Sequence, residues 1–265
     1  MMNQRRMTNT LIGGGGGDKM KNLTILAMVL FSLFLGVQAQ AAVQVIDDST
    51  YGANTYWGAT NYLGGPTNQD VYGGGPFSID KMTVNFAGPI MTVQIIGSYF
   101  TALAANQVYG MLPGDLFIDL QGWNPVGTAP NYGDDSVLSH GQPWDLAFDL
   151  NTSALYSTAG GAITLSNNGM PPVGTPYRTN QEWDFLPGQA PIVGGAWGIA
   201  GDTLTISFNY VGSGIGTATD LGLHWTMQCA NDVVNGGVKG VPEPSMLLLF
   251  GSGLLGLGFF ARKKA

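Results

Sequence analysis

The chain has little positive charge, a single cysteine and two histidines. Residues 42–240 include fifteen acidic residues and only three basic ones (Lys81, Arg178 and Lys239), which gives this stretch a net charge of −12. Such a surface repels phosphate backbones, so we expect no nucleic-acid partner. A strongly negative surface keeps an exported protein soluble, and it can attract divalent cations.

Cysteine and histidine are too scarce for a disulfide scaffold or a transition-metal site. Cys229 cannot form a disulfide within the chain, and we expect it to be a small buried residue. His140 and His224 are far apart in the sequence, and His224 is predicted to point away from Cys229 on the same strand. The glycine runs lack the Lys-Ser/Thr of a phosphate-binding loop, and no G-x-S-x-G motif occurs. We therefore expect no cofactor and no catalytic residues.

The N-terminal region contains the three parts of a secretory signal peptide, which we place at residues 20–41. Lysines open it, an apolar run follows over 23–37, and small residues come next. Ala39 and Ala41 form an A-x-A cleavage site that leaves Ala42 as the new N-terminus. The secretion translocon and signal peptidase are therefore expected partners.

Residues 1–19 do not fit this signal. A run of five glycines, 13–17, stands just before Met20. Glycine codons are rich in G, as is a bacterial ribosome-binding site. We therefore predict that Met20 is the true start and that residues 1–19 are a mistakenly included leader.

A second apolar run, 246–261, lies near the other end of the chain. As a helix it would be about 24 Å long, less than the hydrocarbon core of about 30 Å, so it can insert but is shorter than a permanent span. The residues after it are basic and favour a cytoplasmic end: Arg262, Lys263 and Lys264. The residues before it form an extended spacer, because proline cannot sit inside the helix: Pro242, Glu243 and Pro244.

The order of spacer, glycine-studded apolar helix and basic tail over 241–265 resembles the PEP-CTERM sorting signal of Gram-negative bacteria. The resemblance implies that exosortase, a membrane-embedded cysteine enzyme, recognises and cuts near Pro242-Glu243-Pro244. It also implies delivery from a transient membrane anchor to the cell surface or an exopolysaccharide matrix. Residues 177–182 and 224–232 resemble stretches in the bodies of some such proteins, for which no activity can be carried over.

Alternation of apolar and polar residues is the main pattern between the two ends, and it predicts strands. Glycine and proline clusters separate the runs, and no long window has the helical period. We expect an all-β, jelly-roll-like sandwich over 42–230, with polar outer faces, and a linker over 231–240. The predicted strands are 82–86 and 91–95, which form a hairpin, and 116–120, 146–150, 203–210 and 221–229.

Two alternatives to a non-enzymatic surface protein remain open. The first is a carbohydrate- or calcium-binding adhesion module. Its calcium ligands would be oxygens of Asp47, Asp48, Asp134 and Asp135. Its sugar-stacking aromatics would be among Tyr51, Tyr56, Trp57, Tyr62, Trp123, Trp144, Trp183 and Trp197.

The second alternative is a secreted glycoside hydrolase, which needs two carboxyl groups in one cleft. Glu182 and Asp184 flank Trp183 and would share a strand face, and Asp145 and Asp149 flank a strand turned partly to solvent. Neither pair has a specific signature, so a surface or matrix protein without enzymatic activity is the leading interpretation.

Overall fold

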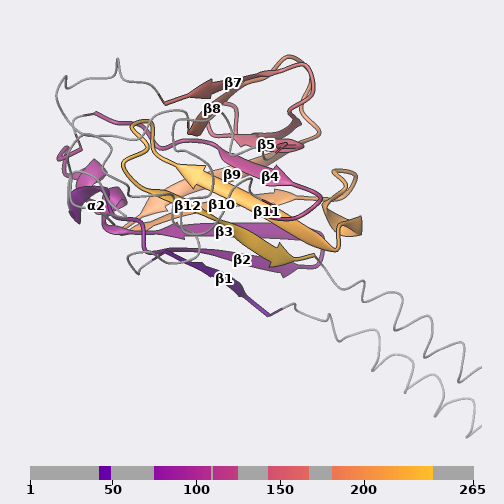
Figure 1. Cartoon of the computed structure of the whole chain (residues 1–265), viewed down its shortest axis with the longest axis horizontal. Helices are drawn as coiled ribbons and strands as arrows, with labels where there is room; N and C mark the ends of the chain where they lie inside the picture. Colours follow the sequence, from indigo (N-terminus) through magenta and orange to yellow (C-terminus); the bar gives the residue numbers. More distant parts are fainter. Residues whose placement is uncertain (1–41, 49–74, 109, 125–142, 167–180, 241–265) are drawn as a thin grey trace, which may run out of the picture. The chain divides into compact units, whose positions relative to one another are not determined.

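Ten antiparallel strands form one continuous sheet within the part of the chain that the computed structural model describes, in the order β1-β2-β3-β10-β9-β6-β5-β4-β11-β12 (Figure 1). The described residues are 42–48, 75–108, 110–124, 143–166 and 181–240. A separate two-stranded sheet, β7-β8, completes the set of described strands.

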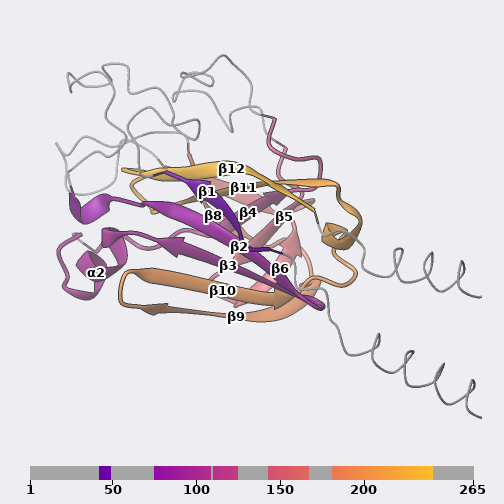
Figure 2. The same ribbon diagram turned by 90° about the horizontal axis from the view of Figure 1, so that it is seen from below.

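The sheet folds into two layers, and β7-β8 lies outside the second of them (Figures 1 and 2). The first layer consists of β1 (Gln44–Asp47), β2 (Lys81–Ala87), β3 (Ile90–Ile96), β10 (Thr203–Asn209) and β9 (Val193–Ala200). The second consists of β6 (Ala154–Ser157), β5 (Leu146–Asp149), β4 (Leu116–Asp119), β11 (Asp220–Thr226) and β12 (Val233–Lys239). The remaining elements are β7 (Ala162–Leu165), β8 (Glu182–Leu186), helix α2 (Ser98–Ala104) and the 3-10 turns η2 (Gly75–Phe77) and η4 (Ile215–Thr217).

Strands β2, β3 and β10 of the first layer alternate because one face meets the core and the other meets solvent. In β2, Met82, Val84 and Phe86 are buried while the residues between them are partly exposed. Two-residue turns join β2 to β3 and β9 to β10, and a glycine with positive φ opens each turn: Gly88 at 56° and Gly201 at 61°. Glycine adopts this conformation without strain, so the hairpins can be tight.

The strands of the second layer are buried on both faces. Their inner side chains, such as Ile118 and Trp225, join the main core between the layers. Their outer side chains contact a second apolar cluster beneath β7-β8, which includes Phe117, Tyr156 and Phe185. All four residues of β4 and all four of β5 are buried as a result, polar ones included.

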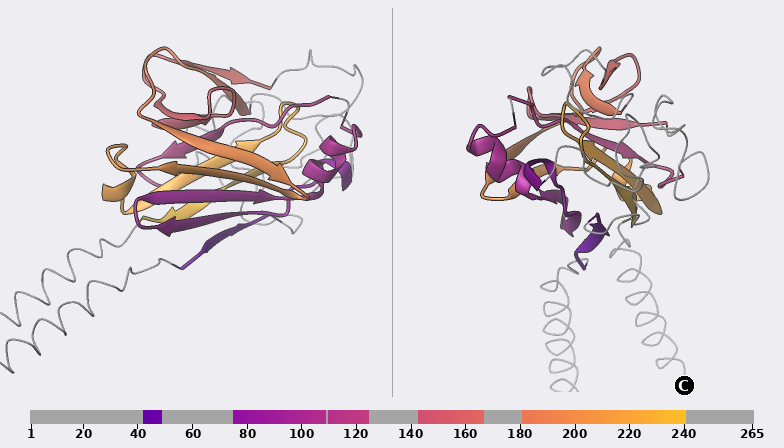
Figure 3. Two further views of the ribbon diagram at one scale, coloured as in Figure 1. Left: turned by 180° about the vertical axis from the view of Figure 1, so that it is seen from behind. Right: turned by 60° about the vertical axis from the view of Figure 1, so that its left-hand side comes forward.

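The two end strands of the sheet, β1 and β12, meet along a seam that nearly closes the sheet into a barrel (Figure 3). The Gln44 side chain makes this contact with the backbone of Lys239. Its Nε2 donates to the Lys239 carbonyl at 2.7 Å, and its Oε1 accepts from the Lys239 N–H at 2.6 Å. The Gln44 amide thus replaces one peptide unit of a neighbouring strand.

The predicted all-β class is confirmed, and so are the hairpin and the strand positions. The jelly-roll order is not observed, because most strands pair with their neighbours in sequence, as in β2-β3, β4-β5-β6, β9-β10 and β11-β12. The predicted linker over 231–240 is wrong, since Val233–Lys239 forms β12 and pairs with β11 along its whole length.

No helix among the described residues is long and apolar enough to cross a membrane. The segments predicted as leader (1–19), signal peptide (20–41) and sorting signal (241–265) lie outside those residues.

Candidate functional site

The residues predicted to direct export and sorting fall almost entirely outside the described residues. These are Ala39, Ala41, Pro242, Glu243, Pro244, Arg262, Lys263 and Lys264. Ala42, the predicted new N-terminus, is described and exposed, two residues before β1. At the other end, β12 finishes at Lys239 and only two residues separate it from Pro242.

The aromatic residues proposed for sugar binding differ in how far they are exposed. Trp144 is buried, and Trp183 is partly buried. Trp197 is 38% exposed, but its indole N–H donates to the Leu150 carbonyl at 2.7 Å. Trp123 is partly buried and stacks on Trp144, with ring centroids 6.2 Å apart. The remaining candidates, Tyr51, Tyr56, Trp57 and Tyr62, lie outside the described residues.

The acidic pairs proposed for glycoside hydrolysis do not face a common cleft. A bulge in the β7-β8 pairing inserts Trp183 between Glu182, which is fully buried, and Asp184, which is partly buried. Asp149, expected toward solvent, is buried and accepts from the Asn151 N–H and the Thr152 hydroxyl. Asp145 is partly buried and accepts from the Leu120 N–H at 2.8 Å.

Glu182 is the most unusual of these acids. Neither of its carboxyl oxygens has a hydrogen-bond partner among the described residues, and the side chain has no exposed surface. Burial raises the pKa of Glu182 to about 7, because a charged carboxylate is unfavourable away from water. The backbone of Glu182 itself and the Trp144 indole partly oppose this rise, through polar contacts that fall short of hydrogen bonds. The carboxyl is therefore about half protonated at pH 7 and largely protonated at lower pH.

His224 lies beside Glu182 with no access to solvent. Its Nε2 contacts the Glu182 carbonyl at 2.6 Å, and its Nδ1 contacts the Asn235 Oδ1 at 2.5 Å. Burial lowers the pKa of His224 to about 4, so the ring is neutral at pH 7. The predicted polar face of β11 is thus an interior face, where His224 contacts Phe117 and Trp144.

Asp115, just before β4, is a buried acid that the sequence pattern did not single out. Its Oδ1 accepts from the Leu150 N–H and its Oδ2 from the Phe185 N–H, both at 2.8 Å. Burial raises the pKa of Asp115 to about 7, and the nearby Asp149 and Asp184 add to the rise. One side chain therefore joins β4 to the ends of β5 and β8, a structural role.

The calcium alternative stays a prediction, because two of its four proposed ligand residues lie outside the described residues. Within the described residues, no group of three or more histidine, cysteine or acidic side chains lies close enough to hold a metal ion. Cys229 is buried in the main core, and burial raises its pKa to about 12. Asp47 is exposed and Asp48 is buried, while Asp134, Asp135 and His140 lie outside the described residues.

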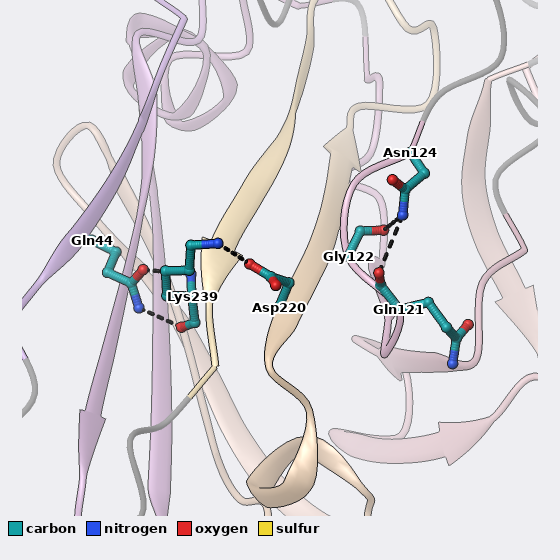
Figure 4. A network of polar contacts seen from close by, with 6 residues as sticks. All are labelled: Gln44, Gln121, Gly122, Asn124, Asp220 and Lys239. Atoms are coloured by element: carbon teal, nitrogen blue, oxygen red, sulfur yellow. Dashed lines mark hydrogen bonds and ion pairs between the residues drawn. The ribbon is translucent and has the colours of Figure 1, made fainter.

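A groove of about 510 Å³ lies where the loop after β4 meets β1, β11 and β12. Gln44, Val45, Trp123, Asp220 and Lys239 are among its lining residues. Lys239 Nζ and Asp220 Oδ1 form an ion pair at 2.5 Å (Figure 4).

Glycines allow the loop to lie against the strands at this point. A Cβ on Gly222 would be 2.8 Å from the Gly122 carbonyl oxygen, and one on Gly237 would be 3.3 Å from the Trp123 Cβ. Within the loop, the Asn124 Nδ2 donates to the carbonyls of Gln121 and Gly122 (Figure 4).

Comparison with known proteins matches only the end of the chain. A family model described as the PEP-CTERM protein-sorting motif matches residues 240–264. The match begins directly after the end of β12 at Lys239. No curated protein matches the chain. No solved structure matches it either.

The matched residues contain the Pro-Glu-Pro spacer, the apolar run and the basic tail. The motif supports an exosortase-processed surface protein and implies exosortase as the processing partner. The chain therefore carries a PEP-CTERM sorting motif over residues 240–264.

Proposed function

We propose that the chain is exported through its signal peptide, held by segment 246–261, cut by exosortase near Pro242-Glu243-Pro244, and released to the surface or extracellular matrix of a Gram-negative bacterium. The observation that carries this proposal is the sorting motif at 240–264, placed immediately after the last strand of a folded body. Its processing partners are then the translocon, signal peptidase and exosortase, and its membrane attachment is temporary.

We propose further that the body acts without enzymatic chemistry. Its buried acids serve the fold: Asp115 and Asp149 accept hydrogen bonds from nearby backbone N–H groups, and Glu182 has no exposed surface. Among the residues lining the groove, Asp220 is the one carboxylate. A glycosidase needs a second carboxyl group across the scissile bond, so this groove lacks the required pair.

Fractionation of cells expressing the chain, with and without the sorting enzyme, tests the sorting proposal. We expect the cells that have the enzyme to release a form whose C-terminus lies near Pro244. Cells without it should retain the full C-terminus in the inner membrane. C-terminal peptide mass spectrometry distinguishes the two forms.

A variant with Glu243→Ala should stay in the membrane, while Asp202→Ala, which removes an exposed acid within residues 42–240, serves as a control for simple loss of a carboxylate. Recovery of intact 246–265 in the membrane of cells that possess the enzyme would contradict the proposal. N-terminal sequencing in the same experiment should find Ala42 first.

A further inference from the structure

The groove between the loop after β4 and strands β1, β11 and β12 has no lining residue within the sorting motif at 240–264. It draws lining residues from four elements, and its volume of about 510 Å³ is within the ~300–1,000 Å³ of small-molecule sites. It combines an aromatic ring, an exposed aliphatic side chain and a solvent-accessible ion pair.

The apolar part of the groove is supplied by Trp123 and Val45. Val45 is 58% exposed although it lies within a strand, so it presents a methyl surface to whatever enters. The Trp123 ring is fixed by its stacking on the buried Trp144, at an interplanar angle of 24°. A fixed ring binds a planar or chair-shaped ligand with little loss of side-chain entropy.

The polar part of the groove is the pair of Asp220 and Lys239. Their side chains are 42% and 81% exposed, so ligand groups can reach them. One N–H of the Lys239 ammonium donates to Asp220 Oδ1. The ammonium has two further N–H donors, and the carboxylate oxygens can accept further hydrogen bonds. An acceptor and a donor thus stand side by side, which suits a hydroxyl because it donates and accepts at once.

We propose that this groove binds a neutral saccharide, a short segment of polysaccharide with its pyranose ring against Trp123 and its hydroxyls on Asp220 and Lys239. A pyranose has apolar C–H faces and a hydroxyl edge, which matches the two parts of the groove. The net charge of −12 over 42–240 disfavours an anionic polymer, and the pairing of Lys239 with Asp220 leaves no excess positive charge in the groove.

This inference rests on the proposed function only in placing the body where it meets polysaccharide. Binding itself is a property of the folded body, so it can be measured without export or processing. A failure of sorting in cells and a failure of binding in solution are therefore separate results.

The test is isothermal titration calorimetry on the full chain in a zwitterionic detergent that contains no sugar. The probes are neutral tetrasaccharides of glucose, mannose and galactose, and an acidic tetragalacturonate. The groove variant is Asp220→Asn with Lys239→Gln. The matched control is Asp202→Asn with Lys81→Gln, which makes the same chemical changes outside the groove.

We expect at least one neutral probe to bind with a Kd below about 1 mM, and the groove variant to weaken it at least about tenfold. The control should bind like the unmodified chain, and tetragalacturonate should bind more weakly. Failure of all neutral probes to bind, equal binding by the groove variant, or preference for the acidic probe would each overturn the proposal. If the double variant loses its native circular dichroism, Lys239→Gln alone replaces it, because that exposed side chain can change without disturbing the core.

Discussion

Replacing Glu182 with glutamine should stabilise the protein above neutral pH and leave its stability nearly unchanged in acid. The folded-state pKa of Glu182 is about 7, against an ordinary value of 4.5. The contribution of Glu182 to the free energy of unfolding is fully present below pH 4.5 and is lost as the pH rises to about 7. In that interval the unfolded chain releases the proton of this carboxyl, whereas the folded chain keeps it. At about 1.4 kcal/mol per pH unit, the two pKa values imply a loss of about 3 kcal/mol.

The glutamine keeps the shape of the protonated side chain and cannot ionise. The free energy of unfolding of Glu182→Gln should therefore exceed that of the unmodified chain by up to about 3 kcal/mol at pH 8, with little difference at pH 4. Urea unfolding of the full chain in mild detergent, followed by tryptophan fluorescence at both pH values, measures this difference.

Other buried groups also change the free energy of unfolding with pH. The test is therefore the difference between Glu182→Gln and the unmodified chain at each pH. Asp115, with its pKa raised to about 7, also loses stability as the pH rises, whereas His224, with its pKa lowered to about 4, loses it as the pH falls below 6.5. Asp202→Asn, at an exposed turn, controls for removal of one negative charge. The same stability difference at pH 4 and pH 8 would refute the reasoning.

Three further changes test contacts of the fold. Asp115→Asn should lower the free energy of unfolding by about 2 kcal/mol at pH 6, since an amide cannot accept from both backbone N–H groups; an unchanged urea midpoint would count against the proposed junction. Trp225→Phe should cost about 2 kcal/mol by calorimetry, because it removes the indole bond to the Gly114 carbonyl and leaves a gap in the core, and a loss below about 0.5 kcal/mol would contradict that role. Gln44→Ala should cost about 1 kcal/mol and speed hydrogen exchange at the Lys239 amide, and an unaltered exchange rate would mean that the seam does not depend on Gln44.

Strands of both layers could be located from the sequence, but the solvent face was predicted correctly only for strands with one face in water. Residues 82–86, 91–95 and 203–210 alternate because only alternate side chains reach the core. Strand β12 escaped prediction because its VVNGGVK sequence does not alternate. Its glycines are explained by distant packing: a Cβ on Gly236 would be 2.7 Å from the Ile46 Cγ2, and one on Gly237 would approach Trp123.

The sequence could predict the sorting motif but not the groove, whose residues are far apart in the chain. The sorting motif is local and could be found from 25 adjacent residues, and the family match at 240–264 confirms it. The groove joins Gln44, Trp123, Asp220 and Lys239, which the chain brings together only by closing its first strand against its last. The polar residues of the second layer were placed in solvent because the covering by β7-β8 comes from residues far along the chain, with a bulge that alternation cannot reveal.

The amide of Gln44 also affects how the protein associates with other copies of itself at high concentration. Strands at the ends of an open sheet present unpaired peptide groups, and neighbouring molecules can add to them one after another. Here a side chain occupies the peptide N–H and carbonyl of Lys239, so an incoming strand finds that position already taken. A protein that accumulates at high local concentration outside a cell would thereby resist uncontrolled stacking into fibres.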